Sequence, residues 1–400
     1  MKRLSLKKYF TGFDNVIRSL LVISLFLFFV TYFIFEEMNK LNYLMYAPAG
    51  MMGVLCVIYY IKKRTLPNVK PLICIYVFVG IAYLTSLIAN PIAALTYKTL
   101  LVLAVFATVI YLSCRIIDDL NAILYIVLIS GMIFVVAFIG VYWRNFIKLD
   151  FSTRLGRFFG NENDMAAKLS IPAALLVSIA VYNRKYWLLP FALVAFVLVI
   201  STGSKMGLIY LAGIMVFGIC SFFRKRIWVG FAVSIAAIMT MAMMIFTLSP
   251  FATIKERLLE HIAYFTGQGN ISASSYDRAL YRDNAFYLAF KNLFIGYGVD
   301  GFDVASDFGT YSHNNISELI CDFGLFGLLS FYGIFVYIAL TFKDARKTID
   351  ATVIYHALLG IILFTSTAGI FYFSKLVFFL FAICIFINQK KNVEYTRITT

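Results

Sequence analysis

The polar cluster His313-Asn314-Asn315 stands directly before a long apolar run. Histidine is the usual general base near neutral pH, because its unperturbed pKa is about 6.5. A helix that begins here would hold the imidazole at the mouth of a membrane span, where a lipid headgroup and water both reach it. The plainer alternative is a helix cap, which Asn314 can supply, beside a solvated imidazole.

A polar segment earlier in the chain combines cations with helix-capping groups. Arg154 and Arg157 precede Asn161 and Asn163, which are good N-cap residues. A helix N-terminus offers unpaired N–H groups to a phosphate, and an arginine adds a bidentate donor. A capped helix with arginines that meet lipid headgroups explains the same pattern.

Two further segments carry cations at informative positions. Lys205 follows the tight polar turn at residues 201–204, where hydroxyl groups, a glycine and a lysine can bind an anion. A hairpin turn with a snorkelling lysine fits this segment equally well. Arg278 and Arg282 are four residues apart and share one face of an expected amphipathic helix. Like charges at this spacing repel, which indicates a shared anionic partner unless neighbouring aspartates neutralise them.

The elements that must position these residues are membrane helices. The chain is 62% hydrophobic and 14% charged, with a mean hydropathy of +0.86, and no soluble domain of 400 residues has this composition. We therefore predict an all-α polytopic membrane protein with about twelve transmembrane helices, because apolar runs of spanning length recur throughout. The expected spans are residues 16–35, 41–61, 71–89, 97–114, 121–142, 164–182, 187–202, 206–223, 227–247, 316–341, 352–370 and 375–388.

The distribution of lysine and arginine predicts the orientation. The termini and alternate short loops are basic, so the positive-inside rule places them in the cytoplasm. Residues 248–315 then form one long extracytoplasmic loop between spans nine and ten of a single membrane domain, residues 1–400. Cations on the outer side are disfavoured by the same rule, and their presence indicates an anionic ligand there. They are Arg144, Lys148, Arg154, Arg157, Lys205, Lys255, Arg257, Arg278, Arg282 and Lys291.

The remaining composition argues against several other classes. The net charge of +15 is dispersed over many loops, which suits orientation and anionic lipid better than a nucleic acid. The six cysteines are scattered and never paired as CxxC. No nucleotide-binding or carboxylate-rich metal motif occurs, so the sequence predicts no metal and no cofactor.

Taken in order, these motifs resemble the O-antigen ligase/polymerase superfamily, which includes the Wzy-type polysaccharide polymerases. The resemblance covers about residues 160–335, and Lys205 stands where the family commonly has an arginine. Its most specific part is the signature that begins at His313-Asn314. The matching residues are Gly160-Asn161-Glu162-Asn163, Ser201-Thr202-Gly203-Ser204-Lys205, Arg278, Arg282, Gly296-Tyr297-Gly298, His313-Asn314, Leu319, Gly324 and Gly327.

The resemblance implies a GT-C-like glycosyltransferase of the plasma or inner membrane. It would polymerise oligosaccharide repeat units carried on undecaprenyl or another polyprenyl pyrophosphate at the outer leaflet, to make O-antigen, capsule or exopolysaccharide. Such a donor is already activated, so catalysis would be independent of metal and nucleotide. The implied catalytic residues are His313, Arg278 and Arg282. The residues expected to bind substrate or pyrophosphate are Arg154, Arg157, Asn161, Asn163, Lys205 and Asn314.

The implied partners are the lipid-linked glycan donor and acceptor and the bilayer, together with flippase and chain-length regulator proteins. Two alternatives stay open. An O-antigen ligase of the same superfamily would carry the same motifs and differ in its acceptor. A lipid-linked oligosaccharide flippase or transporter would suit the number of spans, although no internal repeat is visible and transporters usually place ionisable residues deep in their spans.

The charge pattern makes a testable prediction about topology. A cysteine placed at Gly269, in a protein whose six native cysteines are replaced, should react with a membrane-impermeant maleimide in intact cells. Labelling that requires permeabilised cells would contradict an extracytoplasmic position for residues 248–315.

Overall fold

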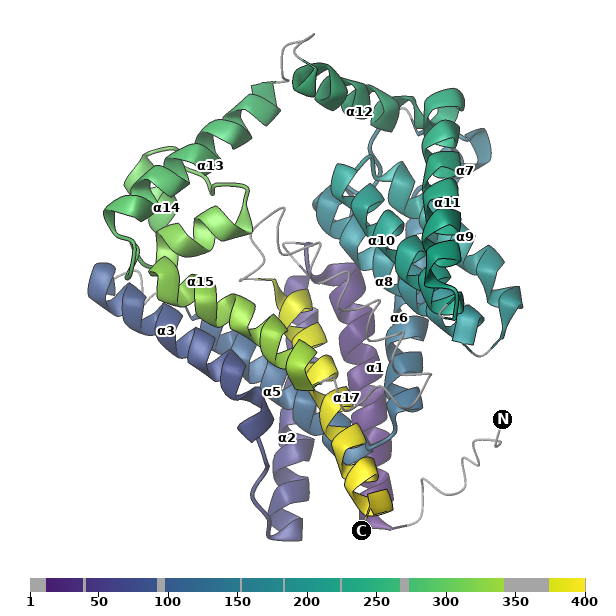
Figure 1. Cartoon of the computed structure of the whole chain (residues 1–400). Helices are drawn as coiled ribbons and strands as arrows, with labels where there is room; N and C mark the ends of the chain where they lie inside the picture. Colours follow the sequence, from purple (N-terminus) through teal and green to yellow (C-terminus); the bar gives the residue numbers. More distant parts are fainter. Residues whose placement is uncertain are drawn as a thin grey trace. The chain divides into compact units, whose positions relative to one another are not determined.

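The computed structural model describes residues 12–38, 41–91, 98–151, 153–182, 184–223, 225–266, 273–341 and 374–399. These ranges are helical and contain no strand (Figure 1). The helices are α1 (Phe13–Phe35), α2 (Tyr46–Lys63), α3 (Ile73–Ala89), α5 (Thr99–Ile117), α6 (Leu120–Val141), α7 (Trp143–Lys148), α8 (Glu162–Tyr182), α9 (Leu189–Ser201), α10 (Lys205–Phe222), α11 (Ile227–Thr247), α12 (Ala252–Phe265), α13 (Ala273–Lys291), α14 (Gly301–Ser306), α15 (Asn315–Thr341) and α17 (Lys375–Thr399).

The prediction of an all-helical polytopic membrane protein is confirmed. Within the described residues, 8 helices are long and apolar enough to cross a membrane, and they include α1, α2, α3, α5, α6, α8, α11 and α15. Three shorter apolar helices, α9, α10 and the first part of α17, fall where spans are also expected. The expected span at residues 352–370 lies outside the described residues.

The chain divides into two compact units. Among the described residues, unit 1 comprises those up to residue 67 and those within 109–258, and unit 2 comprises those within 68–108, 259–341 and 374–399. Two helices, α5 and α12, begin in one unit and end in the other.

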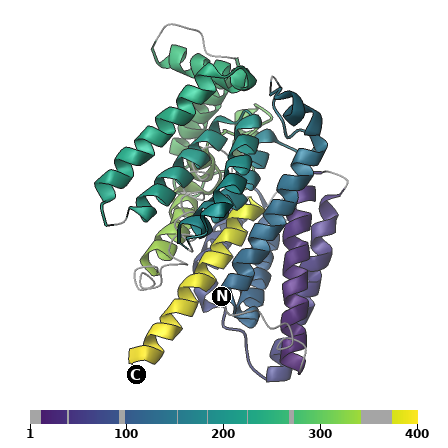
Figure 2. The ribbon, with the colours of Figure 1, turned by 90° about the vertical axis from the view of Figure 1, so that its right-hand side faces the viewer.

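Unit 1 is a helix bundle with close crossings. Helix α1 packs along α2 and α6, as Figure 2 shows, and α8 packs against α6, α9 and α10. Gly131 on α6 permits one of these crossings, because a Cβ atom there would lie only 3.0 Å from the Cβ atom of Pro172 on α8. Small residues at such points let membrane helices approach closely and gain van der Waals contact.

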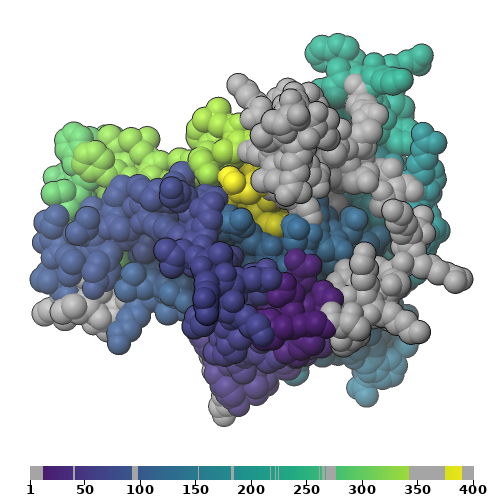
Figure 3. Space-filling model, turned by 90° about the horizontal axis from the view of Figure 1, so that it is seen from below, coloured from purple at the N-terminus to yellow at the C-terminus, as the bar shows by residue number. Residues whose placement is uncertain are grey.

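Unit 2 is built around α15, which packs against α3, α13 and α17. The space-filling view shows α17, in yellow, beside α15 (Figure 3). The ring centroid of Phe78 on α3 lies 5.2 Å from that of Phe331 and 6.3 Å from that of Phe378. Asn388 on α17 donates a hydrogen bond of 2.7 Å to the Oγ1 atom of Thr341, which ties α17 to the end of α15.

The predicted long loop, residues 248–315, contains three helices in its described part: α12, α13 and α14. Helix α13 confirms that Arg278 and Arg282 lie on a helix, as expected from the sequence. It buries Ala285 and Ala289 in a small core with Phe302 of α14 and Cys321 of α15. The part of this segment that forms α13 and α14 is therefore packed into the core of unit 2.

The structure corrects the expectation of one continuous helix over residues 316–341. Gly324 has a φ of 65° and a ψ of −168°, so α15 consists of two helical segments that meet at a break. Residues other than glycine are strained in this backbone conformation. A Cβ atom at Gly324 would also overlap the carbonyl group of Phe294. A glycine at this position therefore does more than permit close packing of helices.

The segment at residues 293–298 fills this break. The N–H groups of Tyr297 and Gly298 donate hydrogen bonds to the carbonyl oxygens of Cys321 and Asp322, at 2.9 and 2.7 Å. These bonds occupy carbonyl groups where the helical pattern is interrupted, and an unpaired buried backbone group would cost about 1–3 kcal/mol. The glycine-rich motif before α14 is thus the structural partner of the glycine in α15.

This arrangement predicts the effect of substituting two glycines of the same helix. Gly324→Ala should destabilise the protein by roughly 2 kcal/mol or more, since it combines a disfavoured φ with a clash against backbone. Gly333→Ala is the matched control, because a Cβ atom there meets nothing within 4 Å. The control should be neutral or stabilising by up to about 1 kcal/mol. Thermal unfolding in detergent measures both, and equal midpoints for the two variants would contradict the account.

Candidate functional site

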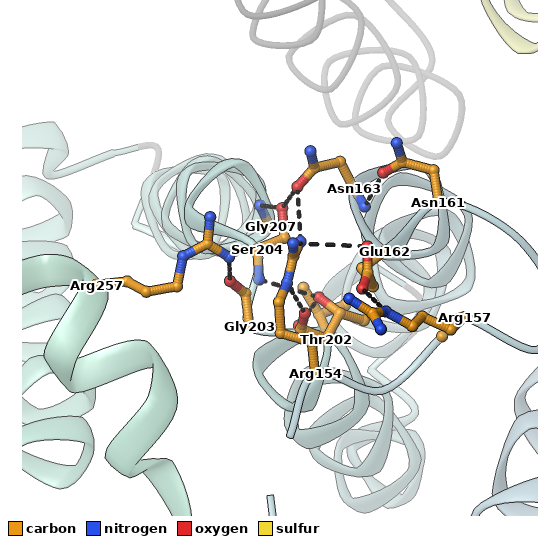
Figure 4. A network of polar contacts seen from close by, with 12 residues as sticks. Arg154, Arg157, Asn161, Glu162, Asn163, Thr202, Gly203, Ser204, Gly207 and Arg257 are labelled. Atoms are coloured by element: carbon orange, nitrogen blue, oxygen red, sulfur yellow. Dashed lines mark hydrogen bonds and ion pairs between the residues drawn. The ribbon is translucent and has the colours of Figure 1, made fainter. Parts of the chain in front are cut away.

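The candidate site residues fall into two groups, one in each unit. In unit 1, Arg154 joins two segments that the sequence analysis treated separately (Figure 4). Its Nε atom donates to the carbonyl oxygen of Thr202 at 3.2 Å, and Nη2 donates to the Oδ1 atom of Asn163 at 3.3 Å. Its Nη1 atom also lies 3.5 Å from a carboxylate oxygen of Glu162. Arg154 therefore fixes the turn after α9 against the start of α8.

The turn between α9 and α10 is held by side chains on both sides. Ser204 caps α10: its hydroxyl accepts from the N–H group of Gly207 at 3.2 Å and donates to Asn163 Oδ1 at 2.7 Å. Gly203 has a φ of 62°, and a Cβ atom there would lie 3.0 Å from the Cγ atom of Arg154. Arg257 of α12 donates to the carbonyl oxygen of Gly203 at 2.8 Å. The sequence analysis did not place Arg257 in the site. The sequence marked Arg257 only as one of the cations expected on the outer side of the membrane.

The other predicted anion-binding residues of unit 1 have different surroundings. Asn161 caps α8, because its Oδ1 atom accepts from the N–H group of Asn163 at 2.8 Å. Arg157 pairs through Nε with Glu162 at 3.1 Å, yet its side chain is 85% exposed. Lys205 is the first residue of α10 and is half-buried. Arg157 is thus the exposed cation of this group, whereas Lys205, Arg154 and Arg257 are each half-buried.

A buried ion pair in unit 1 escaped the sequence analysis. Lys168 lies on α8 and its side chain is 2% exposed, with Nζ 3.0 Å from a carboxylate oxygen of Glu36. The same Nζ atom lies 5.1 Å from the ring centroid of Tyr32 on α1. A buried charge is tolerated only when it is paired, so this contact fixes α8 against the end of α1. No local pattern marks a pair so far apart in the sequence.

In unit 2, the start of α15 confirms the predicted cap. The Oδ1 atom of Asn314 accepts from the N–H groups of Ile316 and Ser317, at 3.0 and 3.1 Å. A side chain in the first turn of α15 reaches back to the residue before His313, since the buried carboxylate of Glu318 accepts from the N–H group of Ser312 at 2.6 Å. Both neighbours of residue 313 are therefore fixed in place.

His313 itself lies outside the helix, with a φ of 57° that is unusual for a residue other than glycine. Its ring centroid lies 4.0 Å from that of Tyr311 and 6.2 Å from that of Tyr281 on α13. Burial, and then the positive charge of Arg278, lower the pKa of His313 to about 4. The imidazole is therefore neutral at pH 7, and its aromatic contacts correct the alternative of a fully solvated ring.

The two arginines of α13 have different partners. Arg278 influences His313 through its charge. Arg282 is paired with the adjacent Asp283, with Nη2 2.7 Å from Oδ1. Neutralisation by an aspartate, which the sequence left open, thus applies to Arg282.

The sequence analysis did not identify Asp300 as a candidate titratable group. Burial, and then the neighbouring Asp303, raise the pKa of Asp300 to about 6.

The side chains that commonly bind metals are dispersed. Among the residues that the structure describes, no three His, Cys, Asp or Glu side chains are grouped so that they could hold a metal ion.

The described helices define a multi-pass membrane protein. Residues 190–332 match the family described as O-antigen ligase, which is part of the O-antigen ligase/polymerase superfamily. The match includes the turn before Lys205, both arginines of α13, His313 and the break at Gly324, so it confirms the resemblance seen in the sequence. Arg154 to Asn163 lie before it. The comparison with curated proteins found no similar sequence.

The electrostatic influence of Arg278 on His313 predicts a measurable titration. Arg278→Gln should raise the pKa of His313 from about 4 towards 6.5, because it removes a cation that disfavours the imidazolium. Arg282→Gln is the matched control and should change this pKa less, since Arg282 is paired with Asp283. NMR titration of the imidazole, with the other two histidines replaced by glutamine, measures both. Equal shifts for the two variants would contradict the assignment.

Proposed function

We propose that this protein is a polysaccharide polymerase of the plasma or inner membrane, with both termini in the cytoplasm. It joins oligosaccharide repeat units that are linked to polyprenyl pyrophosphate at the outer leaflet. A hydroxyl group of the acceptor glycan attacks the anomeric carbon of the donor sugar. The bond from that carbon to the pyrophosphate oxygen breaks, and polyprenyl pyrophosphate leaves with the bonding electrons.

The arrangement around His313 is the observation that carries this proposal. A neutral imidazole can accept the proton of the attacking hydroxyl, and its low pKa keeps it neutral at pH 7. The hydrogen bonds of Asn314 and Glu318 fix the backbone before and after His313. The imidazole is therefore already positioned, and the reaction does not have to bear the entropic cost of ordering it. A helix cap alone does not require the unusual φ of His313, whereas a positioned base accounts for it.

The leaving pyrophosphate carries the negative charge that the cations are proposed to stabilise. We propose that Arg278 and Arg282, on α13 in the same unit as His313, stabilise this charge. Arg157 and Lys205 keep a proposed role in binding phosphate within unit 1. Three other expected ligands, Arg154, Asn161 and Asn163, hydrogen-bond within the protein. We therefore assign them to positioning the segments that carry Arg157 and Lys205, and Asn314 to positioning His313.

A second candidate is the ligase reaction, which the description of the matched family favours. The donor, the leaving group and the proposed roles would be the same, and the acceptor would be a lipid A core in place of another repeat unit. One observation is in line with transport by a flippase: Lys168 is a buried charged residue within a span, and transporters usually carry such residues. Lys168 is only two turns into α8, about 9 Å from its start, so it lies near one end of that span.

The proposal predicts separate effects on chemistry and on binding. His313→Ala should reduce elongation of lipid-linked repeat units by about 10²–10⁴-fold, the usual contribution of a general base. It should still bind the lipid-linked donor, because the proton is transferred only in the transition state. Elongation by purified protein and donor binding to the same sample measure the two effects. Turnover near that of the wild type would show that His313 is structural.

The pH dependence separates His313 from Asp300 as the base. Each base works only when deprotonated, so activity should fall as the pH drops through its pKa. With His313 as the base, kcat/KM should hold down to about pH 5 and fall near 4. A fall near pH 6 that Asp300→Asn abolishes would assign the role to Asp300.

A further inference from the structure

A row of aromatic rings leads from the core of unit 2 to the candidate base. The ring centroid of Phe302, which is buried on α14, lies 6.1 Å from that of Phe308. Phe308 is 4.8 Å from Tyr281, and Tyr281 in turn is stacked with His313 at 6.2 Å. Tyr311 lies on the imidazole at 4.0 Å. The imidazole therefore has one tyrosine ring on α13 and another from the connection before α15 as its neighbours.

Two of these rings stay accessible although they contact the cluster. Phe308 and Tyr311 are each 37% exposed, whereas Phe302 is fully buried. Both belong to the connection between α14 and α15, in which Asp307 and His313 also have positive φ. A connection held in this shape presents its rings at fixed positions beside the base. Packing of the core does not require rings to be left open here.

We infer that Phe308 and Tyr311 form a stacking subsite for one sugar ring of the acceptor glycan. A sugar ring has an apolar face of C–H groups and a rim of hydroxyl groups, which suits an aromatic ring with a polar edge. A sugar ring stacked on Tyr311 would bring its hydroxyl groups close to the imidazole, because the rings of Tyr311 and His313 are in contact. The subsite would thus orient the attacking hydroxyl, a task that a base cannot perform alone.

This subsite rests on the proposed function, and a binding experiment separates the two. The probe is the free oligosaccharide repeat unit of the producing strain, without lipid or pyrophosphate, added to the full-length protein in detergent. Titration calorimetry should give a dissociation constant that rises roughly tenfold in Tyr311→Ala, the effect expected for one lost ring contact. Phe308→Ala should raise it too, and it leaves the contact between Tyr311 and His313 in place.

Two variants control for general damage. Tyr311→Phe keeps the ring and should restore most of the affinity lost in Tyr311→Ala. Tyr287→Ala removes a more exposed tyrosine of α13, 59% exposed, whose ring lies 4.2 Å from the ammonium of Lys291. It should bind as the wild type does. If all exposed rings serve only to anchor the protein at the membrane interface, the three alanine variants should behave alike.

The outcomes are distinct. Weaker binding in Tyr311→Ala and Phe308→Ala, but not in Tyr287→Ala, supports the subsite even if His313→Ala keeps full turnover and the proposed base is wrong. Unchanged binding in both variants overturns the subsite, and a loss of turnover in His313→Ala would then leave the proposed function standing. Absence of binding to the wild-type protein at millimolar concentrations also overturns it.

Discussion

The break in α15 at Gly324 is the constraint on which the rest of unit 2 depends. The N–H group of Leu325, just after the break, donates to the carbonyl oxygen of Leu293, at 2.7 Å. Together with the bonds from Tyr297 and Gly298, this contact joins the end of α13 to the middle of α15. The two glycines that face each other here, Gly296 and Gly324, each lack room for a Cβ atom. A membrane helix can bear such a break only where protein groups satisfy its backbone.

The consequence is a short polar helix ahead of an apolar one. Before the break, α15 buries Asn315, Ser317, Glu318 and Asp322, which would be costly in a span facing lipid. Asp322 accepts from the N–H group of Phe302 at 3.0 Å, so the same half-helix also holds α14. The connection that carries the rings and the imidazole is therefore anchored at both ends. In unit 1, side chains satisfy backbone groups in the same way, because Arg154 and Arg257 donate hydrogen bonds to the carbonyl groups of Thr202 and Gly203 in one turn.

Hydropathy and local signals predicted much of this from the sequence. The apolar runs became helices because a bilayer leaves the backbone few alternatives, and Asn314 caps α15 through bonds within its own turn. The bond from Arg154 to Thr202 spans 48 residues, and the pair of Lys168 with Glu36 is longer still, so no local pattern reveals them. Gly324 was visible in the motif, but a glycine in an apolar run fits helix packing equally well.

The central claim is that this chain performs glycosyl transfer with groups of its own. The most direct measurement is elongation of a purified lipid-linked repeat unit by the purified protein in detergent, with a chelator present and without any nucleotide sugar. The account predicts a ladder of lengthened lipid-linked products and release of polyprenyl pyrophosphate. No elongation in detergent, combined with movement of the same lipid-linked glycan across vesicles that contain the protein, would contradict it and identify a transporter.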